Sequence, residues 1–438
     1  MVATPPPHAP GRVGRLPWLV ALPLALAMCG APAASNSSDG GRRGASDDAS
    51  GGAASSGSSG SGGASSGSLD GAASGGSTGD DASGSTTPEG GREGAAGGGS
   101  DASALPAACA ASDAGNTALG TDMPDPTGMA VPAITYTNVG TAGSYDRVVT
   151  STVAPSCVAN VCQKTATAVS GALVPFDEEM TLVFSGPMDL YQVAVYDAAG
   201  PAASGYTRVA YWDRCTTEGL AWVGNKSWYQ CNGYVQSYVN ADGTMSSPTA
   251  VQFGGHLADG VGVNVMSSTL CTGTTDGTDC GFSRGLALHG FKGDAAGSKI
   301  FVAKMRMPLG NVTPAYWILP AQVVRSSQYG CNCRGQGGQG GCGELDVAEV
   351  LGGNTATPAH PEQATTTIYS FQGVTNGGTA YFQRPVYATA TFVVIFDAPS
   401  SSIAMRRLGA TDFDFAANLP SATVSSWLAN AGVKRPMP

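Results

Sequence analysis

Positive charge is scarce in this chain of 438 residues. Lysine and arginine together number 22, against 32 aspartates and glutamates, and the formal net charge is −10. Binding to nucleic acid or to anionic lipid calls for basic surface patches. The charge balance therefore argues against both partners, whereas neutral polymers remain compatible with it.

Long helical periodicity is also missing. Beyond about residue 130 the apolar segments are short, rich in Val, Thr, Tyr and Phe, and broken by Gly, Pro, Asn and Asp, which is typical of strands and turns. Only 421–432, SATVSSWLANAG, reads as a short helix, capped by Ser421 or Thr423. Many short strands in one domain predict an all-β sandwich or jelly roll. The expected strands are EMTLVFSG, LYQVAVYD, KIFVAKMRM, AYWILPAQVV, ATTTIYSF, ATATFVVIFD and SIAMRRLG.

A single apolar run near the N-terminus is the exception to the lack of long hydrophobic stretches. Arg12 and Arg15 precede LPWLVALPLALAMCG, which is too short for a membrane span and fits a secretory signal over residues 1–29. Two interpretations of the cleavage site compete. LAMC, ending at Cys29, resembles a bacterial lipobox, whereas APAA, which follows it, offers small residues to an ordinary signal peptidase. Met28 departs from the lipobox pattern. We favour a lipid anchor at Cys29 and a cell-surface location, with a fully secreted protein as the alternative.

Apolar residues are nearly absent from the next hundred positions. Residues 30–130 consist mostly of Gly, Ser, Ala and Asp, which bury too little apolar surface to offset the entropy of ordering the chain. We predict a disordered linker there and one β domain over 131–438. The sequence shows no internal repeat, and we expect a monomer.

The 11 cysteines lack paired C-x-x-C spacing. Without Cys29 their number is even, which in an exported chain favours disulfides over a zinc site. We therefore expect no metal and no cofactor. Close spacing suggests the pairs Cys157 with Cys162, Cys215 with Cys231, and Cys271 with Cys280. The pairing of Cys109, Cys331, Cys333 and Cys342 stays open. His256, His289 and His360 are isolated, and we expect them to be hydrogen-bonded structural residues.

Glutamate is rare, with 8 residues in the whole chain, yet two of them stand in one short motif. Glu344, Asp346 and Glu349 form E-x-D-x-x-E directly after the glycine-rich, cysteine-containing stretch CNCRGQGGQGGC. By composition alone, such a motif is expected in only about one chain in a hundred. The cluster therefore calls for a functional or structural reason.

The motif lies in GELDVAEVL, whose apolar residues predict a strand. On a regular strand Glu344 and Asp346 share a face while Glu349 points to the other one. A β-bulge between Asp346 and Glu349 would bring the third carboxylate to the same face. The functional interpretation depends on this predicted bulge.

Three acids facing one cleft can divide the work of glycoside hydrolysis. Mutual repulsion raises the pKa of at least one of them, so that a protonated acid stands beside an ionised neighbour. One carboxylate then attacks the sugar or activates water, while the other protonates the departing oxygen. The competing interpretation is an acidic edge strand whose carboxylates are simply solvated.

Two longer stretches carry a family resemblance. KIFVAKMRMPLGNVTPAYWILP followed by GELDVAEVLGG resembles glycoside hydrolase family 16. FSGPMDLYQVAVYD, CGFSRGLALHGFKG and the cysteine-rich loop before the acids resemble, more closely, the fungal Target-of-SBF cell-wall proteins, a family of β-1,3-glucanase-like proteins. The resemblance covers about 131–428. It implies a concanavalin-like β-jelly roll that acts on β-1,3-glucan with retention of configuration.

The resemblance assigns a role to each acid. It implies Glu344 as nucleophile, Glu349 as general acid/base, and Asp346 as the carboxylate that orients Glu344. Trp317 would stack on a sugar ring, with core packing as the alternative. Where many family 16 members carry a histidine after the acids, this chain has Tyr369, which we include among the substrate-binding residues.

Three functions are considered. The first is a retaining endo-β-1,3-glucanase or glucan-remodelling transglycosylase acting on extracellular β-glucan. The second is a non-catalytic glucan-binding surface lipoprotein on the same fold. The third is a surface or adhesion protein in which the cysteines only stabilise a sandwich. The intact acid triplet favours the enzyme, because a binding module has no need of a protonated carboxylate beside a nucleophile.

Overall fold

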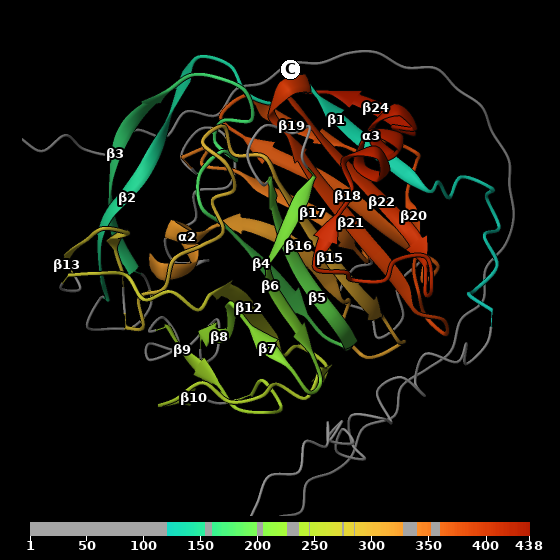
Figure 1. Cartoon of the computed structure of the whole chain (residues 1–438), viewed down its shortest axis with the longest axis horizontal. Coiled ribbons are helices and arrows are strands. Elements are labelled where there is room, and N and C mark those ends of the chain that lie inside the picture. Colours follow the sequence, from blue (N-terminus) through green and yellow to red (C-terminus); the bar gives the residue numbers. More distant parts are fainter. Residues whose placement is uncertain are drawn as a thin grey trace, which may run out of the picture. The chain divides into compact units, whose positions relative to one another are not determined.

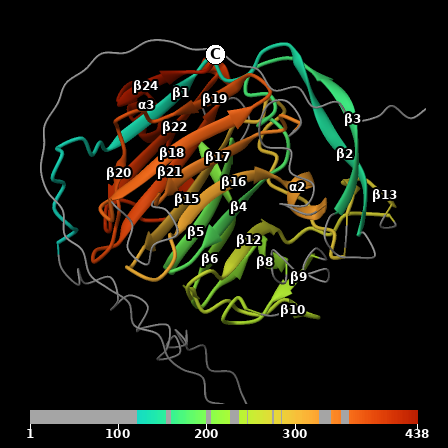
Figure 2. The ribbon, with the colours of Figure 1, turned by 180° about the vertical axis from the view of Figure 1, so that it is seen from behind.

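A computed structural model describes residues 121–153, 160–198, 205–225, 236–244, 246–273, 276–283, 285–326, 340–351 and 360–438. The predicted signal, Cys29 and most of the predicted linker lie outside the described residues. Where the chain is described, none of its helices is both long enough and apolar enough to cross a bilayer. Figures 1 and 2 show these residues as an assembly of strands from two opposite sides.

The first of two large sheets has the strand order β23-β6-β5-β15-β21-β22-β1-β24, with β11 pairing with β5 and β7 with β6. Its pairs are antiparallel except for the parallel pair of β1 with β24. The strands span Ala133–Thr137 (β1), Met188–Ala198 (β5), Tyr206–Asp213 (β6), Thr217–Glu218 (β7), His256–Leu257 (β11), Lys299–Arg306 (β15), Ala390–Asp397 (β21), Ser402–Gly409 (β22), Asn418–Leu419 (β23) and Val433–Pro436 (β24).

The second sheet has the order β10-β9-β8-β12-β4-β16-β17-β18-β19, with β20 pairing with β18. Its described pairs are all antiparallel. The strands span Met180–Ser185 (β4), Leu220–Asn225 (β8), Gln236–Val239 (β9), Ser246–Ser247 (β10), Gly262–Ser267 (β12), Ala315–Pro320 (β16), Glu344–Glu349 (β17), Gln363–Ser370 (β18), Gly373–Asn376 (β19) and Phe382–Gln383 (β20).

Smaller elements complete the described part of the chain. Two strand pairs stand outside the large sheets, and the helices are short. Their bounds are Gly143–Val153 (β2), Asn160–Val169 (β3), Asp276–Thr278 (β13), Gly281–Phe282 (β14), Ala321–Ser326 (α2), Ala398–Ser400 (η4) and Ser421–Ala429 (α3).

The two large sheets share one apolar core. Strand alternation sends Val193 and Val195 of β5 into it from the first sheet, and Leu182 and Phe184 of β4 from the second. Trp212 of β6 and Trp222 of β8 meet there with ring centroids 5.0 Å apart. The described chain is therefore an antiparallel β-sandwich, as the sequence predicted.

The outer faces of the sandwich are covered unequally. β21 is buried along its whole length, because the outer face of the first sheet packs against α3 and the segment before it. β18 instead alternates half-buried and buried residues, the pattern of a strand with one face open to solvent. The outer face of the second sheet is therefore exposed at β18.

Two details of the sequence prediction were wrong. AYWILPAQVV was expected to be one strand, but β16 ends at Pro320 and α2 begins at Ala321. Proline has no N–H for a central ladder, and the Ala321 N–H donates instead to the Glu179 carbonyl. The C-terminal helix was expected to be capped by Ser421 or Thr423, but Pro420 occupies the cap position and no side chain caps it.

The residues before β1 already pack on the sandwich. Asp122 pairs with Arg407 of β22. Asp125 accepts hydrogen bonds from Tyr381 and from the Ala130 N–H. These bonds hold the pKa of the Asp125 carboxyl well below its ordinary value. The interactions of the folded domain thus reach back to Asp122.

Candidate active site

The predicted bulge in β17 is present, and the strand register on both sides of β17 shows it. On β18, Thr367 is opposite Asp346 and Thr365 is opposite Glu349. The single residue Thr366 therefore faces the two residues Val347 and Ala348. On β16, the pairing jumps from Ala348 to Asp346 between successive residues. An extra residue in one strand of a pair is the definition of a β-bulge.

The bulge separates the residues of β17 into two sets. Leu345, Val347 and Ala348 all lie in the core between the sheets. Because Val347 and Ala348 both take core positions, Glu349, the next residue, lies on the same face as Glu344 and Asp346. We call this outer face of β16, β17 and β18 the acidic face.

Cross-strand neighbours place the predicted aromatic residues on the acidic face. Tyr369 of β18 is directly opposite Glu344, and Trp317 of β16 is directly opposite Asp346. Directly paired residues project to the same face of a sheet. The five predicted site residues therefore lie together on three adjacent strands, which Figure 1 shows side by side.

The acids differ in their exposure to solvent. Glu344 and Asp346 are 6% and 7% exposed, whereas Glu349 is half-buried. Beside them Thr365, Thr367 and Tyr369 of β18 are half-buried as well. On the next strand Val374, opposite Tyr369, is 50% exposed. The acidic face thus opens to solvent toward β18 and β19.

Trp317 is mostly buried, with 6% exposure, and packs in an apolar cluster that contains Val183 and Leu319. The packing alternative for Trp317 is therefore realised, and its role in sugar stacking stays a prediction. Trp212 and Trp222 lie in the core between the sheets.

Two threonine hydroxyls hold the backbone of the bulge. Thr366, the residue opposite the bulge, donates to the Asp346 carbonyl at 2.6 Å, and Thr365 donates to the Glu349 carbonyl at 3.0 Å. The hydroxyl of Tyr136 from β1 in turn donates to Thr366 at 3.2 Å. Where a strand ladder is irregular, some carbonyls have no N–H partner on the neighbouring strand. These two hydroxyls donate hydrogen bonds to such carbonyls instead.

Tyr136 stays protonated in this position. Burial raises its pKa well above the ordinary value, the bond with Thr366 acts in the opposite direction, and the charge of Asp346 raises the pKa further. Sequence reasoning missed Tyr136 and the threonines. The run of three threonines in β18 was visible, but nothing local indicates a partner 230 residues away.

The approach to β17 depends on a glycine. Gly343 has φ of 97°, and a Cβ there would come within 3.0 Å of the Phe176 ring. Glycine adopts such a backbone at little steric cost. The neighbouring Cys342 is fully buried and disulfide-bonded. Both features anchor the chain immediately before Glu344.

The predicted disulfides are confirmed in one case. Cys271 and Cys280 are joined, with a Cα–Cα distance of 5.8 Å. Cys162 and Cys215 are also disulfide-bonded, but their proposed partners Cys157 and Cys231 lie outside the described residues, as do Cys109, Cys331 and Cys333. Those pairings stay predictions.

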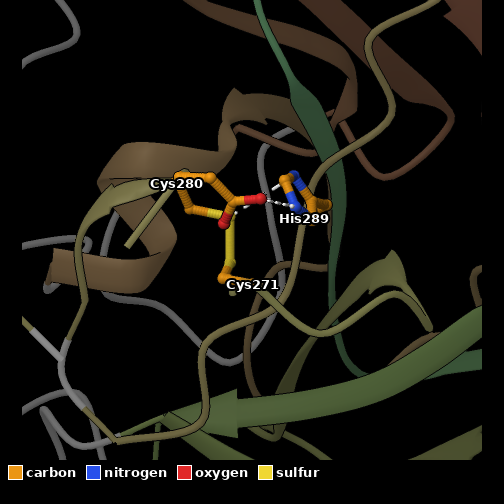
Figure 3. A group of neighbouring side chains, drawn as sticks. Cys271, Cys280 and His289 are labelled. Atoms are coloured by element: carbon orange, nitrogen blue, oxygen red, sulfur yellow. Dashed lines mark hydrogen bonds and ion pairs between the residues drawn. A yellow bond between two sulfur atoms is a disulfide. The ribbon is translucent and has the colours of Figure 1, made fainter. Parts of the chain in front are cut away.

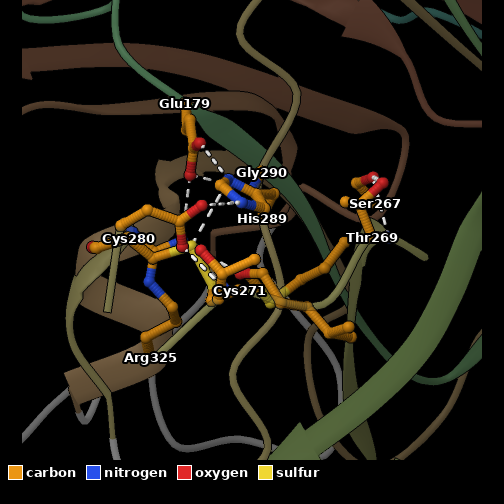
Figure 4. Close-up of a disulfide and its surroundings, with 12 residues drawn as sticks. Glu179, Ser267, Thr269, Cys271, Cys280, His289, Gly290 and Arg325 are labelled. Carbon is orange, nitrogen blue, oxygen red and sulfur yellow. Dashed lines mark hydrogen bonds and ion pairs between the residues drawn. A yellow bond between two sulfur atoms is a disulfide. The ribbon is translucent and has the colours of Figure 1, made fainter. Parts of the chain in front are cut away.

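A polar cluster surrounds the Cys271–Cys280 disulfide (Figures 3 and 4). His289 Nδ1 lies 2.6 Å from a Glu179 carboxylate oxygen and 3.3 Å from the Cys280 sulfur. The same carboxylate accepts a hydrogen bond of 3.0 Å from Arg325 of α2. The cluster ties the disulfide loop to the residue that precedes β4 and to α2, which is a structural role.

The remaining predictions about histidine are also confirmed. His256 contacts Asp189 at 2.8 Å, and His360 contacts Glu362 at 3.3 Å. Together with His289, they are hydrogen-bonded to carboxylates, as expected of structural residues.

One group of side chains in the described part of the chain has the composition of a metal site, namely Cys271, Asp279, Cys280 and His289. Its two sulfurs are bonded to each other, and a thiolate is the form of cysteine that binds metal. The disulfide therefore withdraws both sulfur ligands from this group.

The fold and these residues together define an antiparallel β-sandwich protein with three carboxylates gathered on one outer face by a bulge. A family model described as "Cell wall protein YJL171C/Tos1, C-terminal" matches residues 204–427, and its N-terminal counterpart matches 132–198. The chain belongs to this family of cell wall proteins. The wider relation to glycoside hydrolase family 16 stays a prediction.

Relatives from yeasts have matching names. A Candida albicans protein named "Probable circularly permuted 1,3-beta-glucanase PGA52" is 28% identical over 69% of this chain and 83% of its own length. Two proteins named "Probable circularly permuted 1,3-beta-glucanase TOS1" are similar too. The one from Candida albicans is 32% identical over 52% of this chain and 50% of its own length. The one from Saccharomyces cerevisiae is 31% identical over 49% of this chain and 46% of its own length. No solved structure is significantly similar to this chain.

Proposed function

We propose that this protein is a retaining endo-β-1,3-glucanase or a glucan-remodelling transglycosylase whose reaction takes place on the acidic face. The observation that carries the proposal is the bulge in β17, which brings Glu344, Asp346 and Glu349 to one face. A solvated acidic edge strand has no need of a bulge, and β17 is a central strand with partners on both sides. The names of the relatives, which refer to 1,3-beta-glucanases, support glucan as the substrate.

The proposed mechanism uses the three acids in different roles. The Glu344 carboxylate attacks the anomeric carbon, and the bond from that carbon to the glycosidic oxygen breaks as Glu349 protonates the departing oxygen. The product of this step is a glycosyl ester on Glu344. Water or a sugar hydroxyl, deprotonated by Glu349, then attacks the same carbon and releases Glu344. Two successive inversions retain the configuration.

Asp346 is proposed to act through Glu344. It stands between the other two acids on the bulged strand, and its main chain is held by the Thr366 hydroxyl. A carboxyl group at this position can orient Glu344 during the attack. In this proposal a cleft over the acidic face holds the substrate.

The sugar contacts are proposed to come from the strands beside β17. Tyr369, directly opposite Glu344 and half-buried, offers a ring and a hydroxyl to the sugar next to the reacting bond. Trp317, opposite Asp346, offers its indole edge or supports Asp346 from beneath. Aromatic residues with a polar group suit a substrate that has both apolar C–H faces and hydroxyls.

The family and the N-terminal sequence support the proposed location. The family is one of cell wall proteins, so we propose that the domain over 131–438 works outside the cell. The signal over 1–29, the linker over 30–130, the lipid anchor at Cys29 and the monomeric state belong to this proposal as predicted from the sequence.

Incubation of the purified protein with laminarin, followed by chromatography of the products, tests the proposal. Shorter oligosaccharides indicate hydrolysis, and products longer than an added acceptor indicate transfer. Proton NMR of the first product gives the configuration of the new anomeric centre. Binding of laminarin without any product would favour the non-catalytic glucan-binding module.

A further inference from the structure

A pocket of about 390 Å³ lies on the outer face of the first sheet. It is bounded by Tyr196 of β5, by the segment 411–420 and by α3. The acidic face belongs to the outer side of the second sheet, so the core of the sandwich separates the two places. Nothing in the proposed reaction uses this pocket.

Aromatic rings form one wall of the pocket. Phe413 packs with its ring centroid 6.0 Å from that of Trp427 and 6.1 Å from that of Tyr196. Phe413 is buried, whereas Trp427 is half-buried and keeps part of its indole open. The Tyr196 hydroxyl is held by the Ala416 carbonyl at 2.9 Å. The wall is therefore fixed before any ligand arrives.

Exposed polar side chains form the rim, namely Asp412, Asp414 and Asn418. Asp412 accepts a hydrogen bond from the Gly409 N–H at 2.8 Å, and Asp414 accepts one from the Ala416 N–H at 3.1 Å. A carboxylate has room for about four hydrogen bonds, so each can also accept from a ligand. Their bonds to the backbone keep both carboxylates oriented.

This combination suits a carbohydrate. A pyranose ring has C–H faces that pack on aromatic rings and hydroxyls that donate to carboxylates and amides. The volume lies in the range of small-molecule sites, about 300–1,000 Å³, which accommodates a few sugar rings and not a folded partner. An anionic ligand is disfavoured by the two rim aspartates.

We propose that this pocket is a second, non-catalytic binding site for a short stretch of a neutral glucan. The proposal rests on the proposed function for the identity of the polymer. Packed sheets are about 10 Å apart, with side chains on either side, so two or three sugar rings cannot occupy both sites. The pocket would instead hold a long or insoluble chain while another part of the polymer reaches the acidic face, which raises the effective concentration there.

The test compares binding to insoluble β-1,3-glucan with turnover of a soluble oligosaccharide of three to five sugar rings. Binding is measured by sedimentation of the full chain carrying Glu344→Gln, so that the polymer stays intact. We expect Trp427→Ala to weaken binding about tenfold, as removal of an aromatic anchor usually does. The same substitution, with Glu344 present, should leave turnover of the short substrate within about twofold.

A second variant, called the rim variant, keeps the test decisive if Trp427→Ala does not fold, because Trp427 also packs on the apolar cluster beneath α3. Asn418→Ala combined with Thr423→Ala changes two residues of the pocket that lie outside that cluster, and it should weaken binding about threefold. Ser425→Ala, on the same helix but outside the pocket, is the control and should bind as the parent does. Circular dichroism confirms the fold of each variant.

The outcomes separate the two proposals. If the wild type turns over the substrate, and both folded Trp427→Ala and the rim variant bind glucan as the parent does, the pocket proposal is overturned. The proposed function then still stands. If Trp427→Ala unfolds, the rim variant alone decides. If the protein shows no turnover but binds glucan, and these variants weaken the binding, the pocket proposal is supported and the proposed enzymatic function is overturned. Absence of both binding and turnover overturns both.

Discussion

The Thr366 hydroxyl donates a hydrogen bond of 2.6 Å to the main-chain carbonyl of Asp346. Thr366 is the single residue of β18 that faces the two residues Val347 and Ala348 of β17. The side chain of one strand thus stabilises the irregular backbone of its neighbour, and that backbone decides where Glu349 points. The proposed chemistry depends on this local geometry.

The first prediction concerns the length of the bulge. Deleting Ala348 leaves E-x-D-x-E, which puts the three acids on one face of a regular strand, so measurable activity on laminarin should remain. Inserting an alanine between Val347 and Ala348 makes the separation of Asp346 and Glu349 even, so a strand that keeps its bulge turns Glu349 toward the core, and activity should vanish. The assay is laminarin turnover by chains whose fold is checked by circular dichroism. A folded insertion variant with full activity would show that Glu349 plays no part.

The second prediction concerns the acids themselves. Glu344→Gln keeps the shape of the side chain but removes the nucleophile, so the turnover number on laminarin should fall by about 10⁴-fold or more. Glu349→Ala should lose about 10²–10⁴-fold on substrates with poor leaving groups, and azide, which fits the vacated space, should restore part of the rate. Glu218→Gln, whose side chain is exposed on the first sheet, is the matched control and should keep its activity. Wild-type rates in either acid variant would refute the assignment.

The third prediction concerns the buried Lys299. Its ammonium group donates to the carbonyls of Phe176, Glu178 and Lys292 at 2.8–2.9 Å. Lys299→Met leaves these carbonyls without their donor, and we expect the free energy of unfolding to fall by about 3–5 kcal/mol. Urea denaturation followed by fluorescence measures it. The exposed Lys292 provides the control, because Lys292→Met should change stability by no more than about 0.5 kcal/mol. Equal stability of the two variants would contradict the role of Lys299.

The fourth prediction concerns stability in acid. Burial acts against ionisation of Glu179, but the hydrogen bond from His289 and the charge of Arg325 outweigh it, so the pKa of Glu179 lies below the ordinary value. A carboxyl group with a lowered pKa stabilises the fold above the unfolded-state pKa of about 4.3, and this stabilisation is lost as the pH falls through the folded-state pKa.

Glu179→Gln should therefore be less stable than the wild type at pH 7 and should lose less stability between about pH 5 and pH 2.5. Urea midpoints measured across this range give both quantities. Parallel curves for the wild type and the variant would mean that Glu179 does not contribute to the acid sensitivity.

Much of the fold was predictable because the sequence of each strand indicates which of its residues are buried. The mostly apolar sequences of β5 and β21 indicate buried strands wherever they stand in the chain. The spacing of Glu344, Asp346 and Glu349, taken with the hypothesis that the three acids share one site, also predicted a bulge, since a regular strand would separate them. In these cases the information lies within a few neighbouring residues.

Other features depend on contacts between distant parts of the chain. Tyr136 reaches Thr366 across 230 residues, and the pocket joins Tyr196 to Trp427. Pro320 ends β16 where the motif itself read as a longer strand, and the Ala321 N–H finds its acceptor on Glu179, far away in sequence. Local periodicity specifies which face of a strand is apolar. Which strands pair, which hydroxyls meet their carbonyls and which outer face stays open are decided only when the two sheets pack, because the energies that select them come from non-local contacts.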